Sequence, residues 1–271
     1  MNLQILSLFP QMITELHMHG VIGQALKKQL FSIEVINPRD FALGVHQAVD
    51  DKPFGGGAGM LMIPEPLEKC LTEIKSKFPE THVVFTSPSG KAWNQSRARE
   101  YVNQYSSVTI VCGRYEGVDR RWIEKNVDEE ICIGNYILSG GELAASVMVD
   151  SMVRLLPGVL GNKISINTES FEGDGLLEPP QFTRPAEWQG LIVPEVLRSG
   201  DHKKIQEWNY GMSLISTYLH RGDIFEKLEG VRVKQELVKS LELALKMSEQ
   251  ELKSCGYESE QLEEILNQLK R

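Results

Sequence analysis

Two short apolar runs near the middle of the chain each break into a glycine-rich loop, and this repeated pattern constrains the fold most. Residues 108–112 precede a loop at 113–117, and residues 131–133 precede a loop at 134–141. Between them, residues 118–126 have the length and polarity of a helix. Strand, helix and strand in this order predict a crossover between parallel strands, whose loops leave the same edge of the sheet. Ligands of α/β proteins bind at such edges.

The same pattern occurs once more upstream. Residues 82–86 read as a strand, and the Ser-Pro-Ser-Gly sequence at 87–90 reads as a turn. Each glycine loop alone could be no more than a tight turn. Three such loops, at 87–90, 113–117 and 134–141, are expected to converge on one edge of the sheet, which favours a ligand site.

The rest of the first 160 residues fits an α/β domain. Residues 3–9 and 31–36 read as strands, with helical periodicity over 12–30 between them. Further helices are expected at 64–78, 95–105 and 142–156. The chain is therefore predicted to build an α/β domain over 1–160 around a parallel sheet.

The composition changes after this domain. Glycine and proline are frequent over 157–186, which predicts a flexible linker at 161–175. Residues 176–271 are expected to form a small all-helical domain with helices near 202–208, 212–219, 237–245 and 262–269. Asp201 is the predicted N-cap of the first of these helices.

Charge and composition exclude several classes of protein. No apolar run approaches the roughly 18 residues that span a bilayer, and the start of the chain lacks the features of a signal peptide. A cytoplasmic location is therefore expected.

The four cysteines have no CxxC spacing, so buried reduced thiols are predicted. The net charge of −8 argues against a non-specific polyanion binder, so an RNA partner would need a local basic cluster. The candidates for that cluster are His202, Lys203, Lys204, His220 and Arg221.

The glycine run at 55–59 predicts a mobile loop. The missing GxxxxGK[ST] pattern counts against a phosphate loop, and no GxGxxG pattern follows a strand and opens a helix. A nucleotide-binding α/β protein whose loop at 55–59 holds phosphate is still one alternative at this point. Asp50 and Asp51, just before the run, are either solvated carboxylates or members of a site.

Several longer phrases are more specific. They are VDDKPFGGGAGM (49–60), VCGRYEGVD (111–119), IGNYILSGGELA (133–144), PGVLGN (157–162) and VPEVLRSGDH (193–202). Together and in this order they resemble the bacterial tRNA (guanine-N1)-methyltransferases of the TrmD type, from about residue 1 to residue 225. The last 45 residues or so lie outside the resemblance.

The resemblance implies an S-adenosylmethionine-dependent enzyme of the SPOUT class. Such an enzyme has a deep trefoil knot in its α/β domain, a helical tRNA-binding domain and an obligate homodimer. The implied reaction is methylation of N1 of guanosine 37, the nucleotide 3′ of the tRNA anticodon. A non-catalytic RNA-binding dimer that retains the fold is the alternative.

The resemblance also assigns residues. Arg154 is the implied cation that stabilises charge on O6 of guanine, and Glu169 is the implied general base, where the family has aspartate in a DSF triplet. Asn135 and Asn209 replace a family aspartate and arginine. Mg²⁺ is implied by the family alone, with Glu116 as one ligand. The implied donor-binding residues are Ser87, Pro88, Gly90, Gly113, Arg114, Tyr115, Glu116, Gly117, Ile133, Gly134, Asn135, Tyr136, Ile137, Leu138, Gly140 and Gly141.

Overall fold

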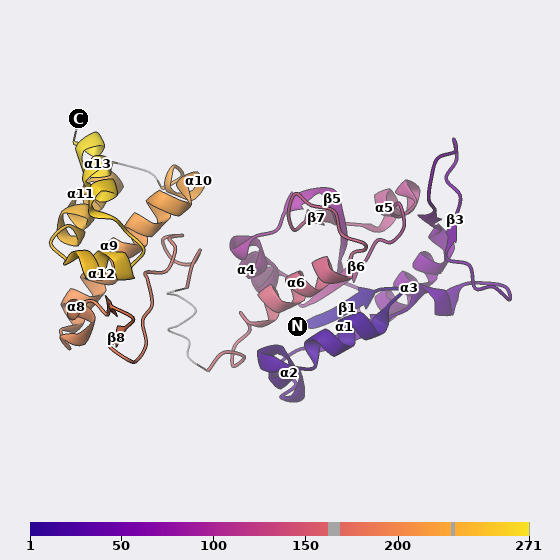
Figure 1. Ribbon diagram of the computed structural model, residues 1–271. Helices are drawn as coiled ribbons and strands as arrows, with labels where there is room; N and C mark the ends of the chain where they lie inside the picture. Colours follow the sequence, from indigo (N-terminus) through magenta and orange to yellow (C-terminus); the bar gives the residue numbers. More distant parts are fainter. Residues whose placement is uncertain (162–168, 229–230, 271) are drawn as a thin grey trace. The chain divides into compact units, whose positions relative to one another are not determined.

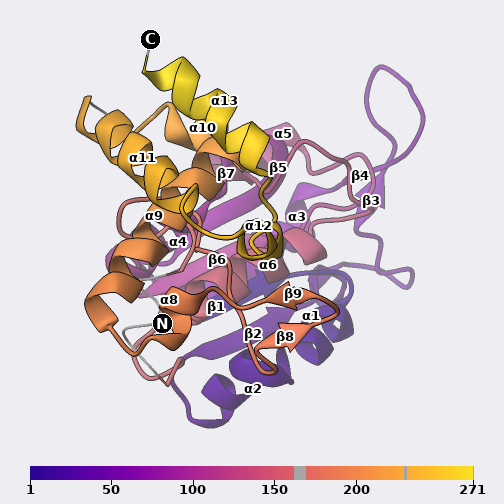
Figure 2. The same cartoon turned by 60° about the vertical axis from the view of Figure 1, so that its left-hand side comes forward.

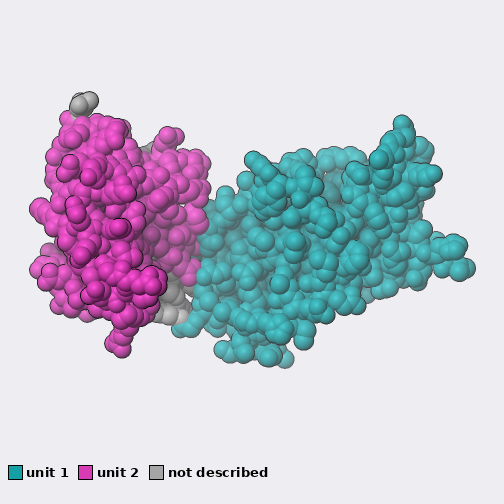
Figure 3. All heavy atoms as spheres, in the orientation of Figure 1, with its two compact units in different colours: residues 1–163 teal, residues 164–271 magenta. Residues whose placement is uncertain are grey.

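The structure is a computed structural model that describes residues 1–161, 169–228 and 231–270 (Figure 1). The chain divides into two compact units, residues 1–163 and 164–271, which Figure 3 shows in different colours. Each unit has its own hydrophobic core.

The first unit is built on a parallel sheet. Five described strands pair side by side, each running parallel to its neighbours. Their order across the sheet is β2 (Ser32–Ile36), β1 (Asn2–Leu6), β6 (Ser107–Val111), β5 (His82–Ala92) and β7 (Glu129–Cys132). The predicted α/β class with a parallel sheet is confirmed.

Alternation along the strands sends apolar side chains to both faces of this sheet. Leu3, Ile5 and Ile110 pack on one face, and Leu6 and Val111 pack on the other. Six helices in the described part of this unit cover the faces. The first face carries α1 (Pro10–His17), α2 (Gly20–Lys27), α4 (Gln95–Gln104) and α6 (Glu142–Val153), and the second carries α3 (Pro64–Lys77) and α5 (Arg120–Asn126). Each fully buried aliphatic side chain contributes about 1.5–3 kcal/mol.

Two elements of this unit differ from the sequence-based expectation. The helix predicted over 12–30 is two helices, α1 and α2, because Gly20, the first residue of α2, takes a left-handed φ of +62°. The turn predicted at 87–90 lies inside β5, which pairs with β7 on both sides of an irregularity between Thr86 and Lys91. A bulge of this kind bends a strand without ending it.

The glycine run at 55–59 is the tip of a short hairpin. β3 (Asp50–Asp51) pairs antiparallel with β4 (Leu61–Met62), after a 3₁₀ turn at Pro38–Phe41. Main-chain hydrogen bonds tie this hairpin to the loop at 113–117. Glu116 N–H donates to the carbonyl of Met60, and Met62 N–H donates to the carbonyl of Gly117, both at 2.9 Å.

In its described residues, the second unit has helices and the β8–β9 hairpin (Figure 2). Its elements are β8 (Glu187–Trp188), β9 (Leu191–Ile192), α8 (Glu195–Arg198), α9 (His202–His220), α10 (Gly222–Phe225), α11 (Val231–Ala244), α12 (Glu249–Ser254) and α13 (Ser259–Leu269). The expectation of an all-helical domain is wrong at the hairpin. Gln189 and Gly190 both have positive φ angles, as the two-residue turn of a β-hairpin requires.

A single helix, α9, replaces the two helices predicted around 202–219, and Asp201 is its N-cap as predicted, accepting from Lys204 N–H at 3.2 Å. The helices that follow complete the core of the second unit. Leu237 and Leu241 of α11 and Leu262 of α13 are buried against Ile215 of α9.

None of the helices in the described part of the chain is both long and apolar enough to cross a membrane. All four cysteines are free thiols; Cys70 and Cys112 are buried as predicted, whereas Cys132 and Cys255 are only half-buried, so the expectation of burial is wrong for these two. Burial raises the pKa of the Cys70 thiol to about 12, so this thiol is protonated at neutral pH.

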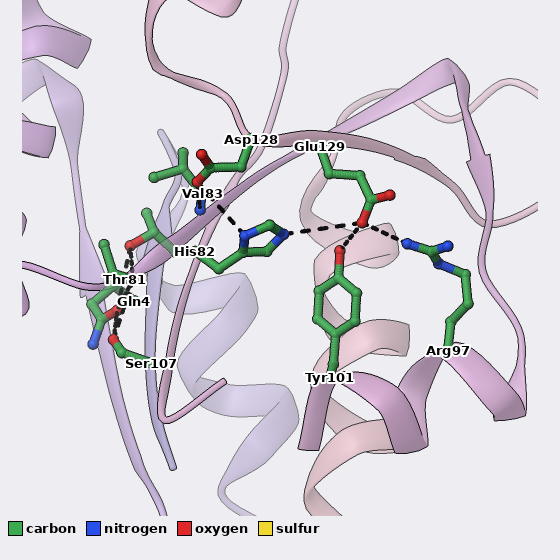
Figure 4. A network of polar contacts seen from close by, with 10 residues as sticks. Gln4, Thr81, His82, Val83, Arg97, Tyr101, Ser107, Asp128 and Glu129 are labelled. Atoms are coloured by element: carbon green, nitrogen blue, oxygen red, sulfur yellow. Dashed lines mark hydrogen bonds and ion pairs between the residues drawn. The ribbon is translucent and has the colours of Figure 1, made fainter. Parts of the chain in front are cut away.

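A polar network on α4 and β7 fixes the edge strand of the sheet (Figure 4). The carboxylate of Glu129 accepts a short hydrogen bond from the Tyr101 hydroxyl, and it pairs with Arg97 at 2.5 Å and Lys91 at 3.0 Å. His82 Nε2 lies 4.0 Å away. Burial works to raise the pKa of Glu129, but these donors hold it below its usual value. The carboxylate therefore stabilises the fold at neutral pH, and this stabilisation is lost as the pH falls below the carboxyl range.

We expect Glu129→Ala to lower the free energy of unfolding by about 2–3 kcal/mol, because Tyr101 and Arg97 would lose a largely buried anionic partner. Urea denaturation at pH 7 measures this. The exposed Glu80→Ala serves as the matched control, with a change below about 0.5 kcal/mol. Equal stability of the two variants would show that the network does not hold β7.

Candidate ligand site at the carboxyl edge of the sheet

The predicted loops at 113–117 and 134–141 meet Ser87 and Pro88 of β5 at the carboxyl edge of the sheet. They enclose a cavity of about 370 Å³, within the range of small-molecule sites. Its lining residues are Phe85, Thr86, Ser87, Pro88, Gly113, Tyr115, Glu116, Gly117, Ile131, Cys132, Ile133, Gly134, Tyr136, Ile137, Leu138, Ser139, Gly140, Gly141 and Ala144.

Close main-chain contact holds two of the loops together. Gly141 N–H donates to the carbonyl of Gly113 at 2.9 Å. A Cβ on Gly141 would come within 2.3 Å of Thr86 Oγ1 and 2.7 Å of Cys112 Cα, so only glycine fits. This part of the cavity wall depends on the close contact of Gly141, just before α6, with the residues that follow β6.

The loop at 113–117 contains a strained residue. Tyr115 has a φ of +58°, in the left-handed region that a non-glycine residue rarely adopts. The hydrogen bond from Gly117 N–H to Arg114 carbonyl, at 3.0 Å, closes the turn around it. Such strain costs about 1–3 kcal/mol and is concentrated at functional sites. Burial, together with the nearby Asp50, raises the pKa of the Tyr115 hydroxyl, so the side chain is neutral at physiological pH.

Most of the predicted donor-binding residues line this cavity, but Gly90, Arg114 and Asn135 do not. Gly90 leaves room for β7, since a Cβ there would lie 2.4 Å from the Glu130 carbonyl carbon, and it lines a separate cavity of about 310 Å³. The side chain of Asn135 is exposed, and that of Arg114 is engaged elsewhere in the unit.

Sequence reasoning missed six residues that line the cavity. Ile131 and Cys132 end β7, and Phe85 and Thr86 lie in β5 just before its irregularity, at the end of the strand predicted over 82–86. Ser139 precedes Gly140, and Ala144 is in the first turn of α6. For the first four, the ends of the predicted strands were the available signal, because the last residues of parallel strands face the same edge as the loops.

A second, larger cavity of about 890 Å³ lies on the first unit, between α1, α2 and α6. Arg154, the C-cap of α6, is on its wall with Asp150, and the Arg154 N–H donates to the Asp150 carbonyl at 3.2 Å. Ile133 and Tyr136 line both cavities, so the two are neighbours. Its wall also carries exposed apolar side chains, namely Leu16, Val21, Leu143 and Val147.

Glu169 belongs to the second unit and Arg154 to the first. Glu169 begins a turn in which Glu172 N–H donates to its carbonyl and Phe171 N–H donates to the carbonyl of Leu176. Leu176 is buried in the core of the second unit, which anchors this turn. The predicted linker extends over 161–175, and its residues 162–168 lie outside the described residues.

The predicted basic cluster is divided along α9. His202, Lys203 and Lys204 are exposed at its first turn, whereas His220 ends the helix and Arg221 is its C-cap. Arg221 pairs with Asp223 at 2.8 Å. Among the residues that the structure describes, no group of three or more His, Cys, Asp or Glu side chains could hold a metal ion.

A parallel sheet with a small-molecule cavity at its carboxyl edge and a helix-rich second unit defines a two-unit α/β protein of the ligand-binding class. The family model described as "tRNA (Guanine-1)-methyltransferase TrmD" matches residues 1–227. The chain therefore belongs to the TrmD family of tRNA (guanine-1)-methyltransferases.

Named relatives agree with the family match over most of their length. A tRNA (guanine-N(1)-)-methyltransferase of Wolbachia pipientis wMel is 46% identical over 224 residues, 82% of this chain and 94% of the relative. The one from Anaplasma marginale (strain St. Maries) is 44% identical over 230 residues, 85% and 97% of the two chains. The one from Latilactobacillus sakei is 44% identical over 230 residues, 84% and 92%.

We expect Gly141→Ala to weaken binding of S-adenosylhomocysteine at least tenfold, because the new methyl group would clash with the main chain of Cys112 and displace Thr86 from the cavity wall. Isothermal titration calorimetry measures the affinity. The control is Gly222→Ala, whose Cβ meets no atom within 4 Å. Unchanged affinity in Gly141→Ala would show that the ligand does not use this cavity.

Proposed function

We propose that this protein transfers a methyl group from S-adenosylmethionine to N1 of guanosine 37 in tRNA, giving 1-methylguanosine and supporting reading-frame maintenance. Membership of the family and the names of the relatives support the reaction. The observation that carries the proposal is the meeting of the two glycine loops with Ser87 and Pro88 of β5 around one cavity of small-molecule size.

The methyl donor is proposed to bind in the 370 Å³ cavity. Gly113, Gly134 and Gly141 carry no side chain, so the main chain of the cavity wall can lie close to a flat adenine ring. The apolar side chains of Ile133 and Leu138 supply the contact surface for such a flat ring. Cavity residues of the two loops and of β5 would thus share one ligand.

The chemistry requires a base and a cation. N1 of neutral guanine carries a proton and is a poor nucleophile, so Glu169 is proposed to accept that proton. Arg154 is proposed to stabilise the negative charge that gathers on O6. N1 then forms the new bond to the methyl carbon while the bond from that carbon to the sulfonium sulfur breaks, which leaves S-adenosylhomocysteine.

The remaining features implied by the family are proposed on the same basis. They are the deep trefoil knot, the cytoplasmic location, and a division into a donor-binding domain at 1–160, a linker at 161–175 and a tRNA-binding domain at 176–271. Mg²⁺ typically keeps several waters and takes only one or two protein carboxylates. Glu116, on the cavity wall, is the carboxylate that could serve it.

A homodimer is proposed in which Glu169 of one subunit and Arg154 of the other act at the same active site. The exposed apolar side chains of the larger cavity, Leu16, Val21, Leu143 and Val147, support the proposal. Contiguous apolar surface of this kind marks protein contacts. A twofold axis would place the same face of both subunits together.

Transfer of a tritiated methyl group to an unmodified tRNA transcript tests the function. We expect incorporation of one methyl group per transcript with guanosine at position 37, and none when that nucleotide is adenosine. Tight binding of the transcript without any transfer would favour the alternative of a non-catalytic RNA-binding dimer.

The shared site can be tested with two inactive variants. We expect Arg154→Ala and Glu169→Gln each to lower the single-turnover rate by about two orders of magnitude, the usual cost of losing a charge-stabilising or proton-accepting group. After subunit exchange between the two variants, mixed dimers would carry one intact site, so about a quarter of the activity should return. No recovery, with exchange verified by mass spectrometry, would refute a site shared between subunits.

A further inference from the structure

One buried carboxylate of the first unit has no part in the proposed reaction. Glu142 is the first residue of α6, directly after Gly141, and it is 1% exposed. Ser7, which follows β1, donates its hydroxyl to Glu142 Oε1 at 2.8 Å. A carboxylate in the first turn of a helix is favoured by the helix dipole. Glu142 does not line the ligand cavity, although Gly141 and Ala144 on either side of it do.

The second oxygen of this carboxylate faces Arg114. Arg114 Nε and Glu142 Oε2 lie 2.9 Å apart, and both side chains are largely buried. The guanidinium also donates from Nη1 to the carbonyl of Ser139 at 3.0 Å and lies 4.3 Å from the centre of the Phe9 ring. Arg114 is thus held by protein groups around its guanidinium, while its chain neighbours Gly113 and Tyr115 line the cavity.

The guanidinium packs directly on the third loop. A Cβ on Gly140 would lie 2.3 Å from Arg114 Nε, so the side chain passes against the main chain there. Arg114 therefore connects the loop at 113–117 with the loop at 134–141, and Glu142 holds Arg114 in that place. Separating the pair would leave a buried charge without its partner, which is strongly unfavourable.

We propose that Glu142 is a positioning residue for the methyl donor, acting through Arg114 to set the spacing of two cavity loops. The proposal rests on the proposed function, since it names what this pair does for the donor site. It also gives Arg114 a different role from the donor contact that the family resemblance implies. Arg114 would align Gly113, Ser139 and Gly140 without touching the donor.

The test uses Glu142→Gln, Arg114→Gln and the double variant. Donor KM, kcat and tRNA KM are measured for each in the methyl-transfer assay, with S-adenosylhomocysteine affinity from calorimetry. The exposed Lys77→Gln, which loses surface pairs with Glu34 and Glu73, is the matched control. Thermal unfolding of every variant separates loss of folded protein from loss of binding.

Each single variant is expected to raise donor KM and the S-adenosylhomocysteine dissociation constant roughly tenfold, because the buried ion pair that holds Arg114 against the loop at 134–141 would be lost. The kcat at saturating donor and the tRNA KM should stay within about twofold, and the double variant should bind no worse than either single one. Lys77→Gln should match the unaltered protein.

Two results would overturn the proposal. A loss of donor binding in Arg114→Gln with normal binding in Glu142→Gln would make Arg114 a direct donor contact. Lower melting temperatures with unchanged donor affinity would make the pair a purely structural feature. If the unaltered protein failed to bind S-adenosylhomocysteine, the proposed function itself would fail, and that outcome is distinct from the other two.

Discussion

The structure depends on the close approach of Gly113 and Gly141, whose main chains meet through a hydrogen bond of 2.9 Å. This contact joins the end of the central strand β6 to the start of α6. It is possible only because neither residue carries a side chain, and Gly141 has no space for one. The cavity, the placement of α6 and the position of Arg154 at the far end of that helix all follow from it. The cavity thus lies at the carboxyl edge of the parallel sheet, where Gly113 and Gly141 form part of its wall.

Sequence patterns predicted much of the first unit, because buried parallel strands are short apolar runs and their glycine loops are easy to recognise. Most of the predicted donor residues line the cavity for this reason. The break at Gly20 and the extension of β5 beyond Thr86 were not predictable in the same way. Both depend on local backbone geometry that apolar periodicity does not record. The β8–β9 hairpin was missed because its strands have only two residues each.

The roles of individual side chains were harder to predict than their locations. Arg114 lies in a motif of the donor loops, yet its guanidinium faces Glu142, and no periodicity could pair residues on separate elements. Glu142 itself looked like an ordinary acidic residue in a first helical turn. Only the three-dimensional arrangement shows that it is enclosed by Ser7 and Arg114. Which buried charges pair with each other is therefore known from the structure and could not be predicted from the sequence.

The last helices of the second unit lie beyond the part of the chain that matches the family model, yet they contribute Leu237, Leu241 and Leu262 to its core. Tyr257, in the same segment, reaches Ser216 of α9 with its hydroxyl. A shortened protein cut back to the family boundary would leave an apolar surface on α9 open to water. The segment beyond residue 227 is thus part of the interior of the second unit and not an appendage to it.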